Sequence, residues 1–169
     1  MQVARYHGRV RAHLMAFFVL VLGFSLAGCS SSKQELPKGP AKPKKVVLLA
    51  APPGNVAELV ANQGAANKAM GYQLLVYVGA TWCEPCKEFH AAVEEGKLDA
   101  AFPGLVLMVF DADADNDRLV AAGYQSSMVP VFFRPAPDGT PSGRQTMGVR
   151  RGADAVADLT PRLKELLAD

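Results

Sequence analysis

The chain has 169 residues, of which half are apolar and 20% are charged, a composition that excludes a disordered or fibrous protein and suits one folded domain with an appended segment. Its net charge of +2 is unevenly divided, because residues 1–45 carry eight Lys and Arg against one acid, whereas residues 46–169 carry ten against fifteen acids. A mildly acidic domain is not expected to bind nucleic acid. Three cysteines are also too few for a scaffold stapled by disulfides, so each needs its own explanation.

Residues 1–28 have the features of a removable export signal. Three arginines precede the run from Leu14 to Phe24, whose eleven residues are too few to span a bilayer as a mature helix, which needs about 20. The signal ends in Leu26-Ala27-Gly28-Cys29, which resembles the lipobox of bacterial lipoproteins. The resemblance implies cleavage before Cys29 and attachment of lipid to that cysteine. The alternative is an ordinary signal peptide or anchor that happens to end near a cysteine.

Residues 29–45 are predicted to form a tether between the lipid and the domain. After Cys29 they contain three prolines, five lysines and almost no large apolar side chain, so they bury too little surface to fold and favour extended backbone. A charged tail without a tethering role is the alternative. The expected location is extracytoplasmic and lipid-anchored. Because Ser30 rather than Asp follows Cys29, the resemblance favours the outer membrane over the inner membrane in a Gram-negative cell.

The remaining residues, 46–169, are predicted to form one α/β domain, because strand-like and helix-like segments alternate. Asn55 is expected to cap a helix that runs to about Met70. Further helices are expected over 84–96 and 115–122 and at the C-terminus, where Pro161 either kinks the helix or lies in its first turn after a Thr160 cap. Strands are expected over 46–51, 73–79, 105–110 and 131–133 and around 144–150, with a turn at Asp138-Gly139 between the last two. The continuous apolar run at 105–110 is typical of a central strand covered on both faces. This order predicts parallel strands joined by crossovers and a terminal antiparallel hairpin.

Residues 82–87, Trp-Cys-Glu-Pro-Cys-Lys, stand where a predicted strand passes into a helix. Two cysteines three positions apart in a first helical turn can close a small disulfide ring. The unpaired N–H groups and the positive dipole end of the helix favour the thiolate of Cys83, which is the nucleophilic form in disulfide exchange. Pro85 fits the first turn, where its missing N–H is not needed. Cys86 lies further along the helix, where it is suited to resolving a mixed disulfide.

Together with two later segments, this motif resembles the thioredoxin superfamily over roughly residues 56–169. One segment is Asp111, followed by a short helix through Gly123-Tyr124, and the other is 128–131, Met-Val-Pro-Val, which is similar to the cis-proline segment of that family. The resemblance implies a thioredoxin-like three-layer sandwich in which helices flank a central mixed sheet. It also implies a redox-active disulfide and no further cofactor.

The resemblance also implies roles for the residues around the cysteines. Pro130 would lie opposite the two cysteines, and Val129 would offer backbone hydrogen bonds to a bound peptide. Trp82 would form a wall beside the disulfide, with packing in the core as the alternative. Glu84, Pro85 and Lys87 are expected to tune the dithiol, since a carboxylate at position 84 opposes a thiolate on its neighbour.

Tyr77 departs from the pattern, because the best-known members have a buried Asp at this position, six residues before the first cysteine, and use it in proton transfer. The Cys-Glu-Pro-Cys sequence also occurs in membrane-tethered thioredoxins that reduce apocytochrome c. However, only 43 residues separate Cys86 from Pro130, which leaves little room for the element usually inserted in those proteins.

No metal site is expected. Zinc requires four ligands, and beside the two cysteines of the motif the domain offers only His90. A surface position on the helix is expected for His90, with assistance in proton transfer as the alternative. The acids at 111, 113, 115 and 117 alternate, but they lack the glycine and the glutamate that a calcium loop requires at its sixth and twelfth positions. A solvated, helix-capping loop is the expected role of these acids.

These features predict a membrane-tethered, extracytoplasmic thiol–disulfide oxidoreductase that reduces protein disulfides through Cys83 and Cys86. The expected partners are protein dithiols or disulfides and a membrane electron donor, and the domain is expected to be a monomer. A cytochrome c maturation reductase is the enzymatic alternative. A binding module whose disulfide is purely structural is the alternative from a different functional class.

Overall fold

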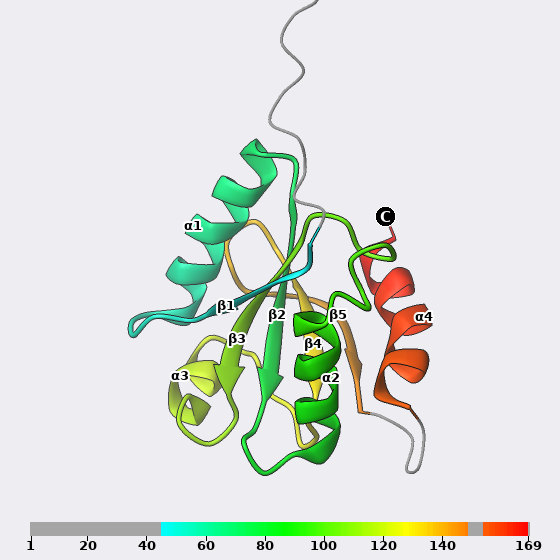
Figure 1. Cartoon of the computed structure of the whole chain (residues 1–169). Coiled ribbons are helices and arrows are strands. Elements are labelled where there is room, and N and C mark those ends of the chain that lie inside the picture. The colour runs from blue at the N-terminus through cyan, green and yellow to red at the C-terminus, as the bar shows by residue number, and fades with distance from the viewer. Residues whose placement is uncertain (1–44, 149–153, 169) are drawn as a thin grey trace, which may run out of the picture. The chain divides into compact units, whose positions relative to one another are not determined.

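The computed structural model describes residues 45–148 and 154–168 (Figure 1), so the predicted leader, Cys29 and nearly all of the tether lie outside the described residues. Strands and helices follow in the predicted order. The strands are β1 (Val47–Ala50), β2 (Gln73–Gly79), β3 (Leu105–Asp111), β4 (Val131–Pro135) and β5 (Pro141–Met147). The helices are α1 (Val56–Ala69), α2 (Glu84–Glu94), α3 (Asn116–Ala121) and α4 (Ala155–Leu167). Within the described ranges, no helix is both long and apolar enough to cross a membrane.

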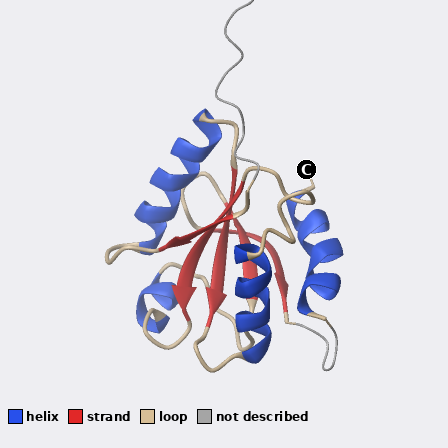
Figure 2. Cartoon of the chain, viewed as in Figure 1, coloured by secondary structure: helices blue, strands red, loops and turns tan. Residues whose placement is uncertain are grey.

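The five strands form one mixed sheet in the order β1-β3-β2-β4-β5. Strand β3 pairs in parallel with β1 and β2, whereas β4 pairs antiparallel with β2 and β5. Helices cover both faces (Figure 2), which confirms the predicted three-layer sandwich. The crossover and hairpin connections expected from the sequence are therefore both present.

Alternate residues of the central strands enter two separate cores, which explains their continuous apolar sequence. Leu75 and Tyr77 of β2 pack in the core with residues of α2 and α4, whereas Val76 and Val78 pack in the core with residues of α1 and α3. Tyr77 is fully buried, with its ring centroid 5.6 Å from that of Phe89 and 5.0 Å from that of Phe132. Three aromatic rings therefore fill the space between β2, β4 and α2.

Two predictions near the C-terminus are refined by the structure. Strand β5 begins at Pro141, earlier than the predicted 144–150, and residues 149–153 lie outside the described part. A proline is tolerated there because it is the first residue of an edge strand. Helix α4 begins after Asp154, whose carboxylate accepts a hydrogen bond from the N–H of Ala157. Pro161 therefore lies inside the helix, and the alternative that placed it in the first turn is wrong.

Three chain segments meet at the edge of the sheet where β2 and β3 end and β4 begins. Gly79 pairs with Asp111 at the ends of the two parallel strands, and Val78 pairs with Val131 at the start of β4. Beyond the strands, the N–H of Ala112 donates to the carbonyl of Gly79 at 2.7 Å. The loops that follow β2 and β3 and precede β4 are therefore neighbours, and the first of them leads through Cys83 into the first turn of α2, where Cys86 lies.

Candidate functional site

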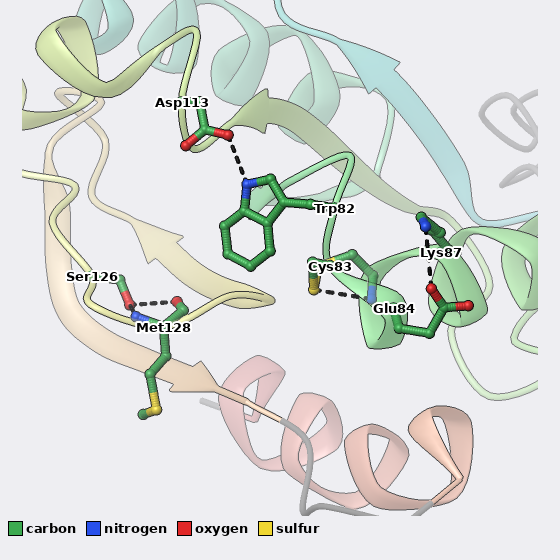
Figure 3. Close-up of a disulfide and its surroundings, with 8 residues drawn as sticks. Trp82, Cys83, Glu84, Lys87, Asp113, Ser126 and Met128 are labelled. Atoms are coloured by element: carbon green, nitrogen blue, oxygen red, sulfur yellow. Dashed lines mark hydrogen bonds and ion pairs between the residues drawn. A yellow bond between two sulfur atoms is a disulfide. The ribbon is translucent and has the colours of Figure 1, made fainter.

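The two cysteines lie at the start of α2 and are joined by a disulfide. Cys83 is the N-cap residue, with extended backbone, and its sulfur accepts a hydrogen bond from the N–H of Cys86 at 3.3 Å (Figure 3). Pro85 lies in the first turn, as predicted, where its missing N–H is not needed. The helix thus presents its positive dipole end and the amide of Cys86, which also donates to the carbonyl of Cys83 at 3.1 Å, to the sulfur of Cys83, an arrangement that favours a thiolate there.

Exposure does not distinguish the two cysteines. The exposed fraction is 4% for Cys83 and 3% for Cys86, and both pack with Ala80, Ala112 and Val129. Their positions on the helix do distinguish them, because only the sulfur of Cys83 accepts an amide of the first turn. The difference in local electrostatics, rather than in burial, supports Cys83 as nucleophile.

Trp82 is exposed and held in a fixed position beside the cysteines. Its side chain is one of the most exposed large apolar groups in the described part, at 64%, which excludes the alternative of core packing. The indole N–H donates to Oδ2 of Asp113 at 2.8 Å (Figure 3). Asp111 stabilises the loop carrying Asp113, because its Oδ1 accepts from the N–H groups of Asp113 and Ala114, each at 2.9 Å. Asp113 was missed by sequence reasoning, which treated the acids only as a solvated loop.

A groove of about 420 Å³ lies beside the disulfide, between the N-terminal end of α2 and the loop before β4. Its lining residues are Trp82, Pro85, Ala112, 126–129 and Gly148. The Val129-Pro130 bond is cis, as the resemblance implies, and Val129 packs against the cysteines. Pro130 is buried, and its carbonyl accepts from the N–H of Gly148 at 2.7 Å.

The loop wall of this groove is braced by Ser126. Its hydroxyl donates to the carbonyl of Met128 at 2.7 Å and accepts from the N–H of the same residue at 3.2 Å. Met128 is 52% exposed and, like Trp82, provides apolar surface at the edge of the groove beside the disulfide. The sequence signalled Val129 and Pro130 but gave no indication of the part played by Ser126 and Met128.

Glu84 and Lys87 form an exposed ion pair next to the cysteines. Nζ of Lys87 lies 3.1 Å from Oε2 of Glu84, one turn apart on α2 (Figure 3). The cation partly offsets the field that the carboxylate exerts on Cys83. Because both side chains are in solvent, the pair changes the local electrostatics only modestly.

Tyr77 and His90 lie at a second cavity, of about 440 Å³, which Cys86 also lines. His90 lies at the surface of α2, as expected, but its side chain is half-buried, and its ring centroid lies 5.2 Å from that of Tyr77. Burial lowers the pKa of His90, and the charge of Glu94 acts in the opposite direction. Burial also raises the pKa of Tyr77 well above its ordinary value, so this hydroxyl stays protonated at neutral pH.

The acidic loop differs from the predicted helix cap. Asp115 occupies the N-cap position of α3, but its side chain makes no capping hydrogen bond. Instead, its Oδ2 accepts from the N–H of Asp111 at 2.8 Å, and its Oδ1 pairs with Arg118 at 2.9 Å. The described residues contain no group of three or more His, Cys, Asp or Glu side chains placed to hold a metal ion.

Comparison with known proteins finds distant structural likeness. No protein-family model and no curated protein matches the chain. A mutant thioredoxin from Halobacterium salinarum is 20% identical with a TM-score of 0.47, over 78% of this chain and 98% of that one. Thioredoxin O1 from Arabidopsis thaliana is 18% identical with a TM-score of 0.46, over 73% and 99% of the two chains. A poplar thioredoxin h is 21% identical with a TM-score of 0.45, over 74% and 98%.

The fold assignment stands on the geometry of the chain itself. The mixed sheet runs in the order β1-β3-β2-β4-β5 with helices on both faces, a cysteine pair begins α2, and the bond before Pro130 is cis. These features match what the sequence predicted. The chain therefore has a thioredoxin-like fold, with a disulfide-bonded cysteine pair at the start of α2.

Proposed function

We propose that this protein is a lipid-anchored, extracytoplasmic thiol–disulfide oxidoreductase that reduces protein disulfides with Cys83 and Cys86. One observation carries the proposal: Cys83 caps α2, accepts an amide N–H on its sulfur, and lies beside a groove with an exposed indole and an exposed thioether at its rim. The groove suits an extended peptide that carries a disulfide. The Cys83–Cys86 pair is itself the redox group, and no other cofactor is needed.

The reaction begins with the reduced protein. The thiolate of Cys83 attacks one sulfur of the substrate disulfide, so that a Cys83–substrate bond forms, the substrate S–S bond breaks, and the leaving thiolate takes a proton. Cys86 then loses its proton and attacks the sulfur of Cys83, which forms the Cys83–Cys86 disulfide and releases the second substrate thiol. Two electrons pass from the protein to the substrate.

A reductant of dithiol class must return the protein to its reduced state. Since the proposed site lies outside the cytoplasm, we assign this role to a membrane protein that delivers electrons across the bilayer. Lipid on Cys29 and the tether at 30–45 would hold the domain, acting as a monomer, at a membrane surface. Ser30 after Cys29 favours the periplasmic side of the outer membrane in a Gram-negative cell.

The two alternatives differ from this proposal in what they require. A dedicated reductase of apocytochrome c usually carries an inserted element, whereas the chain between α2 and β4 holds only β3 and α3 with their loops among the described residues. A binding module with a structural disulfide would not need a sulfur at a helix N-cap beside an open groove.

Trapping of mixed disulfides tests the proposal. In Cys86→Ala the resolving thiol is missing, so covalent complexes with protein substrates should accumulate through Cys83 and should disappear on treatment with a reducing agent. Cys83→Ala is the matched control and should trap few or none. Equal or stronger trapping by Cys83→Ala would reverse the two roles, and trapping by neither variant would favour a structural disulfide.

The reduction potential of the Cys83–Cys86 pair tests the direction. A value of about −270 mV, as in thioredoxin, supports a reductase, and a value of about −120 mV indicates an oxidase.

A further inference from the structure

The loop that follows β3 is attached to its surroundings by one arginine of α3. Nε and Nη2 of Arg118 lie 3.0 and 2.9 Å from Oδ1 of Asp115. Nη1 donates to the carbonyls of Pro52 at 2.7 Å and Gly54 at 3.4 Å. The guanidinium also lies over the ring of Phe110, 5.0 Å from its centroid, in a cation–π contact. Arg118 therefore joins α3, the end of β3 and the loop between β1 and α1.

The contact between Arg118 and Asp115 is suited to holding a structure in place. The two side chains are 23% and 19% exposed, in contrast to the solvent-exposed pair of Glu84 and Lys87, so solvent screens their attraction less. The planar guanidinium contacts a carboxylate and two carbonyls at once, which the single nitrogen of a lysine could not do.

Asp115 connects Arg118 with the start of the loop. Its Oδ2 accepts from the N–H of Asp111 at 2.8 Å, and its own N–H donates to the carbonyl of Asp111 at 3.0 Å. Oδ1 of Asp111 in turn accepts from the N–H of Asp113 at 2.9 Å, and Oδ2 of Asp113 accepts from the indole N–H of Trp82 at 2.8 Å (Figure 3). A continuous series of contacts therefore runs from Arg118 to the indole.

The charges of the loop make its shape dependent on this arginine. Four acids alternate between positions 111 and 117, and like charges this close repel one another. Arg118 is the only Lys or Arg in the sequence between Lys97 and Arg134. Removing its guanidinium would leave the partly buried carboxylate of Asp115 without its cation, which is costly, so the loop should rearrange.

We propose that Arg118 is a positioning residue, which fixes the indole of Trp82 beside the disulfide by holding the loop that carries Asp113. Arg118 lines neither the groove beside the disulfide nor the cavity of Tyr77, so it acts through these neighbours rather than on the cysteines. The consequence for substrate rests on the proposed function. A peptide in the groove packs against the indole, so loss of the arginine should weaken binding of a protein disulfide and leave the exchange chemistry of Cys83 unchanged.

Fluorescence can follow the indole directly, because Trp82 is the only tryptophan in the chain. The anisotropy of its emission is measured in the full-length chain with the disulfide oxidised, and circular dichroism verifies that each variant is folded. The variants are Arg118→Ala, Asp113→Ala and the two combined. Asp115→Asn is included in case Arg118→Ala does not fold. Its amide oxygen can still accept from the N–H of Asp111, whereas its amide nitrogen cannot pair with a guanidinium.

Arg134→Ala is the matched control. Arg134 donates to the carbonyls of Ala168 at 2.7 Å and Leu166 at 3.3 Å, distances close to those of the two carbonyl contacts of Arg118. It lies near the end of β4, whereas the disulfide groove lies at the start of that strand. The control therefore removes similar contacts at a place remote from the loop after β3.

Arg118→Ala should lower the anisotropy to the value of Asp113→Ala, and the combined variant should lower it no further, because both changes release the same indole. Asp115→Asn should give the same loss, and Arg134→Ala should give none. In the reduction of insulin, with dithiothreitol as the reductant, Arg118→Ala should raise KM for insulin about two- to fivefold with kcat unchanged, which corresponds to the loss of one hydrogen bond.

An anisotropy equal to that of the parent in both Arg118→Ala and Asp115→Asn would overturn the inference. A further loss in the combined variant, or an equal loss in Arg134→Ala, would also overturn it, because the arginine would then act by another route or only on overall stability. A lower anisotropy with an unchanged KM would overturn the link to substrate binding. If the parent chain does not reduce insulin, the proposed function fails, whereas the anisotropies still decide whether Arg118 positions the indole.

Discussion

Replacing Tyr77 with Phe and with Ala separates what its ring does from what its hydroxyl does. The ring is fully buried, and its centroid lies 5.0–5.6 Å from those of Phe132, His90 and Phe89. The hydroxyl has no hydrogen-bond partner among the described residues. We therefore expect the ring to account for nearly all of the contribution that this side chain makes to stability.

The expected magnitudes differ strongly between the two variants. Removing a buried aromatic ring costs about 3–5 kcal/mol of unfolding free energy, so Tyr77→Ala should lose about that much. At about 4 °C per kcal/mol for a domain of this size, the melting temperature should fall by roughly 12–20 °C. Tyr77→Phe leaves no protein group unpaired, and its unfolding free energy should stay within about 1 kcal/mol of the parent.

The two variants should also differ at alkaline pH. Burial raises the pKa of Tyr77 above its ordinary value of 10.0, so the unfolded chain releases this proton at a lower pH than the folded one. Stability from the neutral phenol is complete below pH 10 and is lost as pH rises beyond it. Tyr77→Phe should show a smaller loss above pH 10. Buried Tyr124, whose pKa is raised in the same direction, remains and keeps part of the loss.

Thermal and urea unfolding, followed by circular dichroism with the Cys83–Cys86 disulfide kept oxidised, measure these differences. A loss of more than about 2 kcal/mol in Tyr77→Phe would contradict the expectation that the hydroxyl is unpaired, because a cost of that size arises when a hydroxyl with a strong hydrogen-bond partner is removed. A loss of unfolding free energy below about 1 kcal/mol in Tyr77→Ala would show that the packing of the three neighbouring rings does not depend on the ring of Tyr77.

Three further predictions concern the anchor, the ion pair and the exposed indole. Cys29→Ala should move the chain from the membrane pellet to the soluble fraction with its disulfide chemistry retained; pelleting after leader cleavage would contradict the lipid anchor. Glu84→Gln should raise the rate at which iodoacetamide alkylates reduced Cys83 by less than about tenfold. The effect is small because the interaction between an exposed carboxylate and a thiolate at contact distance amounts to only about 1 kcal/mol. An unchanged or slower rate would show that Glu84 does not oppose the thiolate. Asp113→Ala removes the hydrogen bond to the indole of Trp82 and should raise KM for a protein disulfide about fivefold, which corresponds to roughly 1 kcal/mol for one hydrogen bond. The rate of Cys83 alkylation is the control and should not change. An equal effect on alkylation would place the role of Asp113 at the cysteine instead.

Much of the fold could be predicted because it depends on short-range patterns. The run of apolar residues at 105–110 indicated a strand covered on both faces, and β3 has that environment. Asn55 was identified as a helix cap, and its Oδ1 accepts from the N–H of Glu58 at 3.1 Å. The start of α2 at the cysteine pair was also predictable, since a cysteine followed two residues later by Pro85 suits a first helical turn.

The order of strands and helices, the position of the cysteine pair at a helix start and the candidate proline before β4 could thus be predicted from the chain alone. Which distant side chains surround the sulfurs depends instead on the folded sheet. Asp113 reaches Trp82 across 31 positions, and His90 packs its ring against that of Tyr77 on a neighbouring strand. Periodicity and capping act within a few residues, whereas these contacts depend on the pairing of Gly79 with Asp111 and on how α2 packs over the sheet. The residue pattern of one strand does not show how that strand aligns with its neighbour. The residues that surround the cysteines can therefore be identified only from the folded sheet.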